Sequence, residues 1–372
     1  MPAITLFLIS FLLINRFSLE LWGNFVAYLL VVNLTAHIIN WGNKEYLIRA
    51  FSEYPSKISS AFYTHLFSRG LILILSCPIL FLCFELEMAF WLIFWVTGLY
   101  LYQSSESLII YTKKFNIQVL VEAIALVISL AYIMLNETIS VLNIIQLFTL
   151  VMWIKVLFVL ITIYPSKVAF GIDLDQLKLS APFFIIGLSG LLQSRVDQYI
   201  IALNCSKEMI ASYQLFLSMF ILLQSLSSII FVPFNKIIYR IGIDVFRKIQ
   251  LKIAILSVLL VVIITPALSL ILSSLFHLEI NVYFYIIGAF FAFPPFIYVP
   301  IIYLFYRVKR EKEIMYVNYI GAGSNLLLTF YFVNYGNPFN AVVASALAQW
   351  GMLIWYSYRK KGIIHEIKLS SL

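Results

Sequence analysis

Two charged side chains, Arg195 and Asp197, lie in an apolar stretch that otherwise has the composition of a membrane-spanning helix. A charge at the centre of a bilayer costs roughly 2.5–3.5 kcal/mol on insertion scales, so each charge needs a partner or a polar cavity. The residues are two positions apart, which places them about 200° apart around a helix and prevents a pair within it. We expect Arg195 to bind an anionic substrate group and Asp197 to position it or to bind a coupling cation; the alternative is structural pairing with other helices.

The helical spacing assigns further polar residues to the faces of these two charges. Asp197 shares a face with Gln193 and Asn204, at spacings of four and seven, and Arg195 shares one with Gln198. Because the helix is polar on more than one side, each charge must face a cavity or another helix.

Four more charged residues fall within apolar segments of the first half: Arg69, Glu106, Glu122 and Lys155. With Arg195, the two basic residues Arg69 and Lys155 could line one cavity and bind phosphate oxygens, Arg as a two-point donor and Lys as a point charge. We therefore predict all four as substrate-binding candidates. The alternatives are that the two cations and two carboxylates neutralise each other, and that Arg69 extends to the membrane surface.

The composition places the chain among membrane proteins. Of its 372 residues, 63% are hydrophobic and 11% are charged, whereas soluble domains are about 25% charged. The net charge of +8 comes from short basic clusters between apolar segments, so it does not indicate a nucleic-acid partner. The three cysteines form no C-x-x-C pair and predict neither disulfide nor metal site.

The apolar segments predict an all-α integral membrane protein, because a lipid-exposed backbone must satisfy its hydrogen bonds within helices or a closed barrel. The runs are long and do not alternate, which excludes the barrel. We predict about twelve spans, at 1–15, 24–41, 61–84, 88–111, 115–135, 139–164, 180–203, 212–233, 251–273, 282–306, 314–333 and 339–357. The first is too short for a full span and lacks signal-peptide features, so we interpret it as a truncated first helix.

Basic residues predict the orientation. Most of the 25 lysines and arginines fall in alternate segments between the spans, whereas the intervening segments contain Arg16 and Lys207. We therefore predict both termini to be cytoplasmic. Segment 166–179 is interpreted as an amphipathic cytoplasmic connector between an N-terminal six-helix lobe, 1–165, and a C-terminal one, 180–372.

Several sequence features bear on moving parts and on catalysis. Pro294 and Pro295 predict a break in the span 282–306, and Pro266 predicts a kink in the preceding one. There is no phosphate-binding loop of the ATPase type, no H-E-x-x-H and no nucleophile elbow, and the four histidines are scattered. We therefore predict no cofactor and no enzyme activity.

A resemblance to a known family is carried mainly by the seventh and eighth predicted spans. The stretch Gln193–Ile201, with Arg195 and Asp197, followed by Glu208–Tyr213 and the span end Val232-Pro233-Phe234, resembles bacterial polysaccharide flippases. These form the O-antigen flippase branch of the multidrug/oligosaccharidyl-lipid/polysaccharide exporter superfamily. The turn Leu19–Phe25 is similar to the family's turn after the first helix, although the family's first glycine is absent here.

The resemblance implies a fold, a substrate and partners. It implies two six-helix lobes that form a V around a central cavity, and Arg195 and Asp197 as the family's seventh-helix pair. The implied substrate is a polyprenyl-diphosphate-linked oligosaccharide, an O-antigen or capsule repeat unit. The implied mechanism is alternating access across the bacterial inner membrane without ATP. Membrane lipids surround the protein, and the polymerase and chain-length regulator of the same glycan pathway are implied partners.

Two other functions are compatible with a polytopic helical chain. A multidrug exporter of the same superfamily, coupled to a cation, would need acidic coupling sites, and the excess of basic over acidic residues within the spans argues against it. A membrane glycan polymerase or glycosyltransferase would need a sizeable outer loop or an acidic catalytic pair, and the sequence contains neither.

Overall fold

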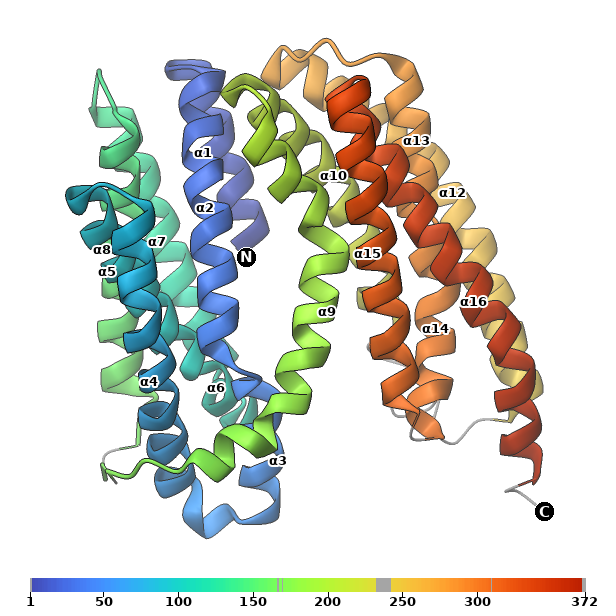
Figure 1. Cartoon of the computed structure of the whole chain (residues 1–372), viewed down its shortest axis with the longest axis horizontal. Helices are drawn as coiled ribbons and strands as arrows, with labels where there is room; N and C mark the ends of the chain where they lie inside the picture. The colour runs from blue at the N-terminus through green and yellow to red at the C-terminus, as the bar shows by residue number, and fades with distance from the viewer. Residues whose placement is uncertain (1, 166, 169, 232–241, 309, 370–372) are drawn as a thin grey trace. The chain divides into compact units, whose positions relative to one another are not determined.

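The computed structural model describes residues 2–165, 167, 168, 170–231, 242–308 and 310–369 (Figure 1). These residues form α-helices, two short 3-10 helices and no β-strand, which confirms the all-helical class. Segment 232–241 lies outside the described residues, and with it Val232-Pro233-Phe234, Lys236 and Arg240.

Each predicted span coincides with a helix or, at two spans, with a pair of helices. The helices are α1 (Pro2–Arg16), α2 (Leu19–Asn40), α3 (Asn43–Glu53), η1 (Pro55–Lys57), α4 (Ile58–Cys83), α5 (Leu86–Ser104), α6 (Glu106–Thr112), α7 (Phe115–Leu135), α8 (Val141–Thr162), α9 (Leu174–Asn204), α10 (Lys207–Phe231), α12 (Ile243–Phe276), α13 (Val282–Ala292), α14 (Pro294–Arg307), α15 (Glu311–Tyr335), η3 (Pro338–Asn340) and α16 (Ala341–Leu369). Of these, α3 and η1 lie between the predicted spans 24–41 and 61–84. Eight segments of the described chain are long and apolar enough to cross a membrane.

The chain divides into two compact units, Met1–Leu188 and Ser189–Leu372. We call them the N-terminal unit and the C-terminal unit. The boundary falls inside α9, whose first turns include residues 174–179 of the predicted connector. Lobes of six helices each, at 1–165 and 180–372, stay a prediction.

Each unit has an aromatic core. In the N-terminal unit Trp22, Phe25 and Trp95 are at most 2% exposed, and Phe25 stacks on Trp95 with 5.9 Å between ring centroids. In the C-terminal unit a Cβ atom on Gly288 would lie 2.5 Å from the ring of Phe220, so the absent side chain lets α13 approach α10 closely.

Large apolar side chains are exposed along the helices, among them Ile74, Leu75 and Leu82 of α4 and Val262 and Ile263 of α12. Such an apolar exterior suits contact with lipid rather than water.

The proline-rich span is interrupted as the sequence predicts. α13 ends at Ala292 and α14 begins at Pro294, because proline has no backbone N–H to continue the helical hydrogen bonds. α12 instead continues through Pro266 as one helix.

The turn between α2 and α3 is shaped by Gly42. Its φ of +68° favours glycine, and an added Cβ would lie 2.7 Å from the carbonyl oxygen of Ser180 on α9. Beside it, Trp41 stacks on Phe184 at 4.2 Å and donates its indole N–H to the carbonyl of Leu177 at 2.9 Å. The first half of α9 is therefore held tightly on the N-terminal unit at this turn.

Gly42→Ala is expected to destabilise the protein by at least ~1–2 kcal/mol, the cost of a left-handed backbone for a residue with a Cβ, with the clash against α9 in addition. Thermal unfolding of the purified protein in detergent measures the change. Gly323→Ala is the matched control, because a Cβ at this helical position meets nothing within 4 Å. Equal melting temperatures for the two variants would contradict the close approach of α9.

Candidate functional site

Asp197, on α9 of the C-terminal unit, is 1% exposed and has three hydrogen-bond donors around its carboxylate. It accepts hydrogen bonds from the Tyr213 hydroxyl of α10 at 2.5 Å and from the Ser345 hydroxyl of α16 at 2.9 Å. A third comes from the backbone N–H of Gln198 at 2.9 Å. These contacts match the sequence alternative in which Asp197 pairs with other helices, and its role in coupling stays a prediction.

The cluster extends to α15 through Asn325. The Asn325 side-chain oxygen lies 3.3 Å from the Ser345 hydroxyl and accepts a bond from the Thr329 hydroxyl at 3.0 Å. We call Asp197, Tyr213, Asn325, Thr329 and Ser345 the Asp197 cluster. All five are at most 3% exposed, so the cluster joins α9, α10, α15 and α16 inside one unit.

The Asp197 cluster contains no basic side chain, and in the described part of the chain Asp197 forms no ion pair. The charge of Arg195 acts on the carboxylate without forming an ion pair with it, and a buried ionised carboxylate whose direct partners are all neutral donors is expensive. Asp197 is therefore suited to hold either a proton or a cation.

Arg195 lies on the other side of α9. One guanidinium nitrogen donates to the side-chain oxygen of Gln198 at 3.0 Å, as their shared helical face predicts. Among the described residues no carboxylate lies within ion-pair distance of Arg195. Most of its five N–H donors are thus left for another group.

In the N-terminal unit, Lys155 and Glu122 form a buried ion pair. The Lys155 ammonium of α8 lies 2.9 Å from a Glu122 oxygen of α7, and the side chains are 11% and 3% exposed. The other Glu122 oxygen accepts from the Tyr102 hydroxyl of α5 at 3.0 Å, and Tyr102 also places its ring 5.5 Å from the ammonium. These contacts match the sequence alternative in which the charges of the first half neutralise each other.

Arg69 is completely buried on α4 and does not extend to a surface. Its guanidinium donates to Nδ1 of His65 at 3.1 Å, to the hydroxyl of Ser104 at 2.7 Å and to the carbonyl of Asn40 at 3.4 Å. The ring of Tyr100 lies 5.1 Å away and adds a cation–π contact. Protein groups on three helices therefore occupy the guanidinium.

Glu106, at the start of α6, lies 3.8 Å from the ammonium of Lys44 on α3, and both side chains are about one-third to two-fifths exposed. The pair sits at the surface, where such contacts contribute little stability.

Sequence reasoning missed the partners of these charges. Tyr213, Asn325 and Ser345 are polar residues within predicted spans, and intramembrane polar side chains are the signal that could have identified them. The sequence predicts no role for His65, one of four scattered histidines. In the structure its Nε2 lies 3.3 Å from the hydroxyl of Ser180 on α9.

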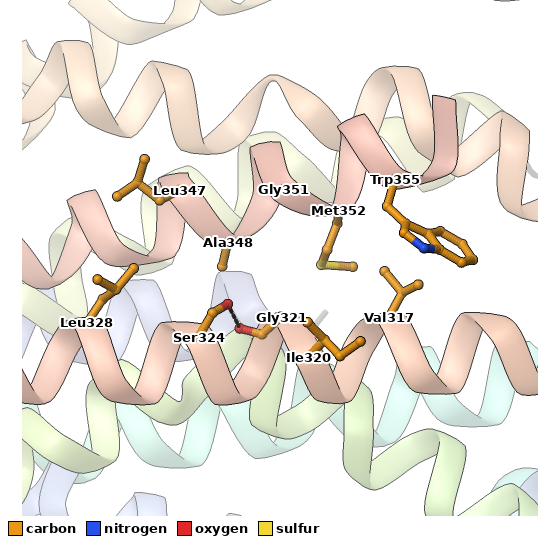
Figure 2. Close-up of a pocket in the computed structure, with 10 residues that line it drawn as sticks. All are labelled: Val317, Ile320, Gly321, Ser324, Leu328, Leu347, Ala348, Gly351, Met352 and Trp355. Atoms are coloured by element: carbon orange, nitrogen blue, oxygen red, sulfur yellow. Dashed lines mark hydrogen bonds between the residues drawn. The ribbon is translucent and has the colours of Figure 1, made fainter. Parts of the chain in front are cut away.

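A pocket of about 320 Å³ lies between α15 and α16 of the C-terminal unit (Figure 2). Figure 2 shows side chains from both helices facing it, with Met352 and Trp355 on α16 opposite Val317 and Ile320 on α15. Its lining is apolar apart from Ser324, and none of the charged candidate residues contributes to it.

No protein-family model matches the chain, and no curated protein sequence matches it. Two solved structures are similar in fold. One is an inward-facing multidrug resistance MATE family transporter of the MOP superfamily, with a TM-score of 0.59, 11% identity, and coverage of 97% of this chain and 95% of that one. The other is the lipid II flippase MurJ in an inward closed conformation, with a TM-score of 0.53, 15% identity, and coverage of 99% and 84%.

The helical fold of this chain is therefore that of MATE and MurJ transporters over nearly its whole length. At such low identity the likeness concerns the fold alone, and it confirms the predicted all-helical membrane fold.

Removing one partner of the buried pair tests its structural role. Lys155→Met is expected to lower the free energy of unfolding by about 3–5 kcal/mol, because Glu122 is left buried without a counter-charge. Adding Glu122→Gln to Lys155→Met removes that charge and is expected to restore part of the loss. Denaturant unfolding of the two single variants and the double variant gives the coupling. Additive effects would contradict the pairing.

Proposed function

We propose that this protein flips a polyprenyl-diphosphate-linked oligosaccharide, an O-antigen or capsule repeat unit, across the bacterial inner membrane. The likeness to transporters of the MOP superfamily supports the class, and one observation carries the substrate chemistry. Of the three cations predicted to bind phosphate, Lys155 is paired with Glu122 and Arg69 is held by protein groups. Arg195 has no carboxylate partner among the described residues, so its remaining donors suit a diphosphate.

In this proposal the two six-helix lobes form a V around a cavity, and their rocking exposes the cavity to one side of the membrane and then to the other. Both termini are cytoplasmic. The oligosaccharide and diphosphate pass through the cavity while the lipid chain stays in the bilayer. Arg69, Lys155 and Glu122 hold the N-terminal lobe together, and Glu106 pairs at its surface. Transport needs no cofactor, and the pathway's polymerase and chain-length regulator act on the product.

The Asp197 cluster supplies the coupling in this proposal. A proton or cation bound at Asp197 changes the net charge inside a cluster that joins four helices. A ligand shifts a two-state equilibrium only by its different affinity for the two states. Loading and release of the ion at Asp197 therefore drive the change of access, provided that the cluster packs differently in each state.

A cation-coupled drug exporter is the second candidate. The buried acid Asp197 and the MATE transporter's similar fold favour it. This candidate differs from the flippase in that it gives Arg195 no role in substrate binding, because a guanidinium repels a cationic drug.

Arg195→Ala is expected to abolish export of surface glycan, because the diphosphate loses its two-point donor. The measurement is complementation of a strain that lacks its own O-antigen flippase and carries a matching glycan operon, with surface polysaccharide ladders as the readout. Arg247→Ala, an exposed arginine on α12, removes the same charge and is expected to preserve the ladder. A normal ladder from Arg195→Ala, with as much of the variant in the membrane as of the wild type, would contradict this role of Arg195.

Asp197→Asn is expected to uncouple transport. An amide cannot take up and release a proton, and it lacks the negative charge that attracts a cation. Purified protein in liposomes, given a fluorescent lipid-linked diphosphate, should flip it at a rate that no longer responds to an imposed pH or sodium gradient. Tyr213→Phe is the control, since it removes one hydrogen bond but keeps the carboxylate. A gradient response that survives in Asp197→Asn would contradict this assignment.

A further inference from the structure

A second pocket, of about 390 Å³, lies in the N-terminal unit where α3, η1, the start of α4 and the start of α9 meet. Figure 1 shows α3 and the first turns of α9 at the same end of this unit. We call this space the α3–α9 pocket. Its lining contains none of the charged candidate residues; it is formed by Tyr46, Arg49, Ala50, Glu53, Tyr54, Lys57, Ser60, Ala61, Gln176, Leu179 and Phe183.

The position of the pocket follows from the two faces of α3. Leu47 and Phe51 are buried on one face. Tyr46, Arg49 and Glu53, spaced by three and four residues, turn to the other face and line the pocket. The helix therefore presents a polar wall opposite α9.

The charged groups of the α3–α9 pocket are Arg49, Lys57 and Glu53. Arg49 uses its Nε on Glu53 at 2.9 Å, which leaves its other guanidinium N–H groups. Lys57 forms no ion pair within the described chain and only approaches the Tyr54 ring, at 5.9 Å. The pocket lining thus has two cations and one carboxylate, with Asp173 nearby acting on Tyr46, and the remaining guanidinium and ammonium donors fit a ligand with anionic oxygens.

Four further lining residues are apolar, which favours a ligand with an apolar part beside its anionic group. Ala50, Ala61, Leu179 and Phe183 supply these contacts. A small inorganic anion would leave this surface unused.

The segment that leads into α9 exposes a row of apolar side chains. Val168, Phe170, Ile172 and Leu174 expose between 52% and 79% of their surface at alternate positions. The segment is fixed on α4, where the Phe170 ring packs at 4.8 Å from that of Phe67. A row of exposed apolar side chains beside a basic pocket is the arrangement of a protein surface that meets lipid headgroups.

We propose that the α3–α9 pocket binds the phosphate-bearing headgroup of an anionic membrane phospholipid. Lys57 and Arg49 contact the phosphate, the tyrosine rings and Phe183 cover the glycerol region, and the acyl chains leave along the exposed apolar segment. A lipid bound there contacts α3 and α9 together and so strengthens the attachment of α9 to the N-terminal unit. This site is separate from the proposed flipping of the diphosphate and does not depend on it.

Native mass spectrometry of the purified chain in detergent tests the proposal, with phosphatidylglycerol and phosphatidylcholine as probes. The wild type is expected to retain phosphatidylglycerol preferentially. The double variant Arg49→Gln/Lys57→Gln is expected to bind it roughly 10- to 30-fold more weakly. Both side chains are exposed, so the variant is expected to fold, and its melting temperature checks this.

The matched control is Arg247→Gln/Lys248→Gln, which removes two exposed basic residues from α12 and is expected to leave lipid retention unchanged. Two results would overturn the proposal. One is equal retention of phosphatidylglycerol by the pocket variant and the wild type. The other is displacement of the lipid by an excess of inorganic phosphate together with equal binding of phosphatidylcholine, which would identify a soluble anion as the occupant.

Discussion

Charges buried in a low-dielectric helix bundle need partners, and this requirement organises both units. Leaving one member of a buried pair alone costs several kcal/mol, and in the described chain the buried charges Arg69, Glu122, Lys155 and Asp197 are met by groups on neighbouring helices. Glu122 and Lys155 satisfy each other across α7 and α8. Arg69 is satisfied by neutral groups on α2, α4 and α5. These contacts fix helix positions in the N-terminal unit, so Arg69, Glu122 and Lys155 are already used within the protein.

The C-terminal unit is arranged differently, and the difference supports a functional division between the units. Asp197 has neutral donors but no cation, and Arg195 has an amide but no carboxylate, among the described residues. The two charges act on each other electrostatically but form no ion pair in the described chain, and in our account each receives a mobile charge. In our account a cation or proton meets Asp197 and a diphosphate meets Arg195, so one helix serves both coupling and substrate binding.

Much of the fold could be predicted from the sequence, because lipid imposes a simple rule on length and composition. Each apolar window became a helix or a helix pair, and the Pro294-Pro295 break falls where the missing N–H groups require it. The charged residues could be identified by the same rule, since any charge in a span stands out. Their partners could not, because hydroxyls and amides such as Tyr213, Ser345 and Asn325 are common in spans and only the packing of α10, α15 and α16 on α9 selects them. The burial of Arg69 likewise depends on contacts with α2 and α5, which the spacing of residues along one helix does not show.

The central claim is that Arg195 recognises the diphosphate of a lipid-linked substrate. The most direct test is the affinity of the purified protein for a polyprenyl diphosphate compared with the uncharged polyprenol of the same chain length. The account predicts tighter binding of the diphosphate, and loss of that difference in Arg195→Gln while polyprenol binding is unchanged. Equal affinity for the two lipids, or a difference that persists in Arg195→Gln, would contradict it.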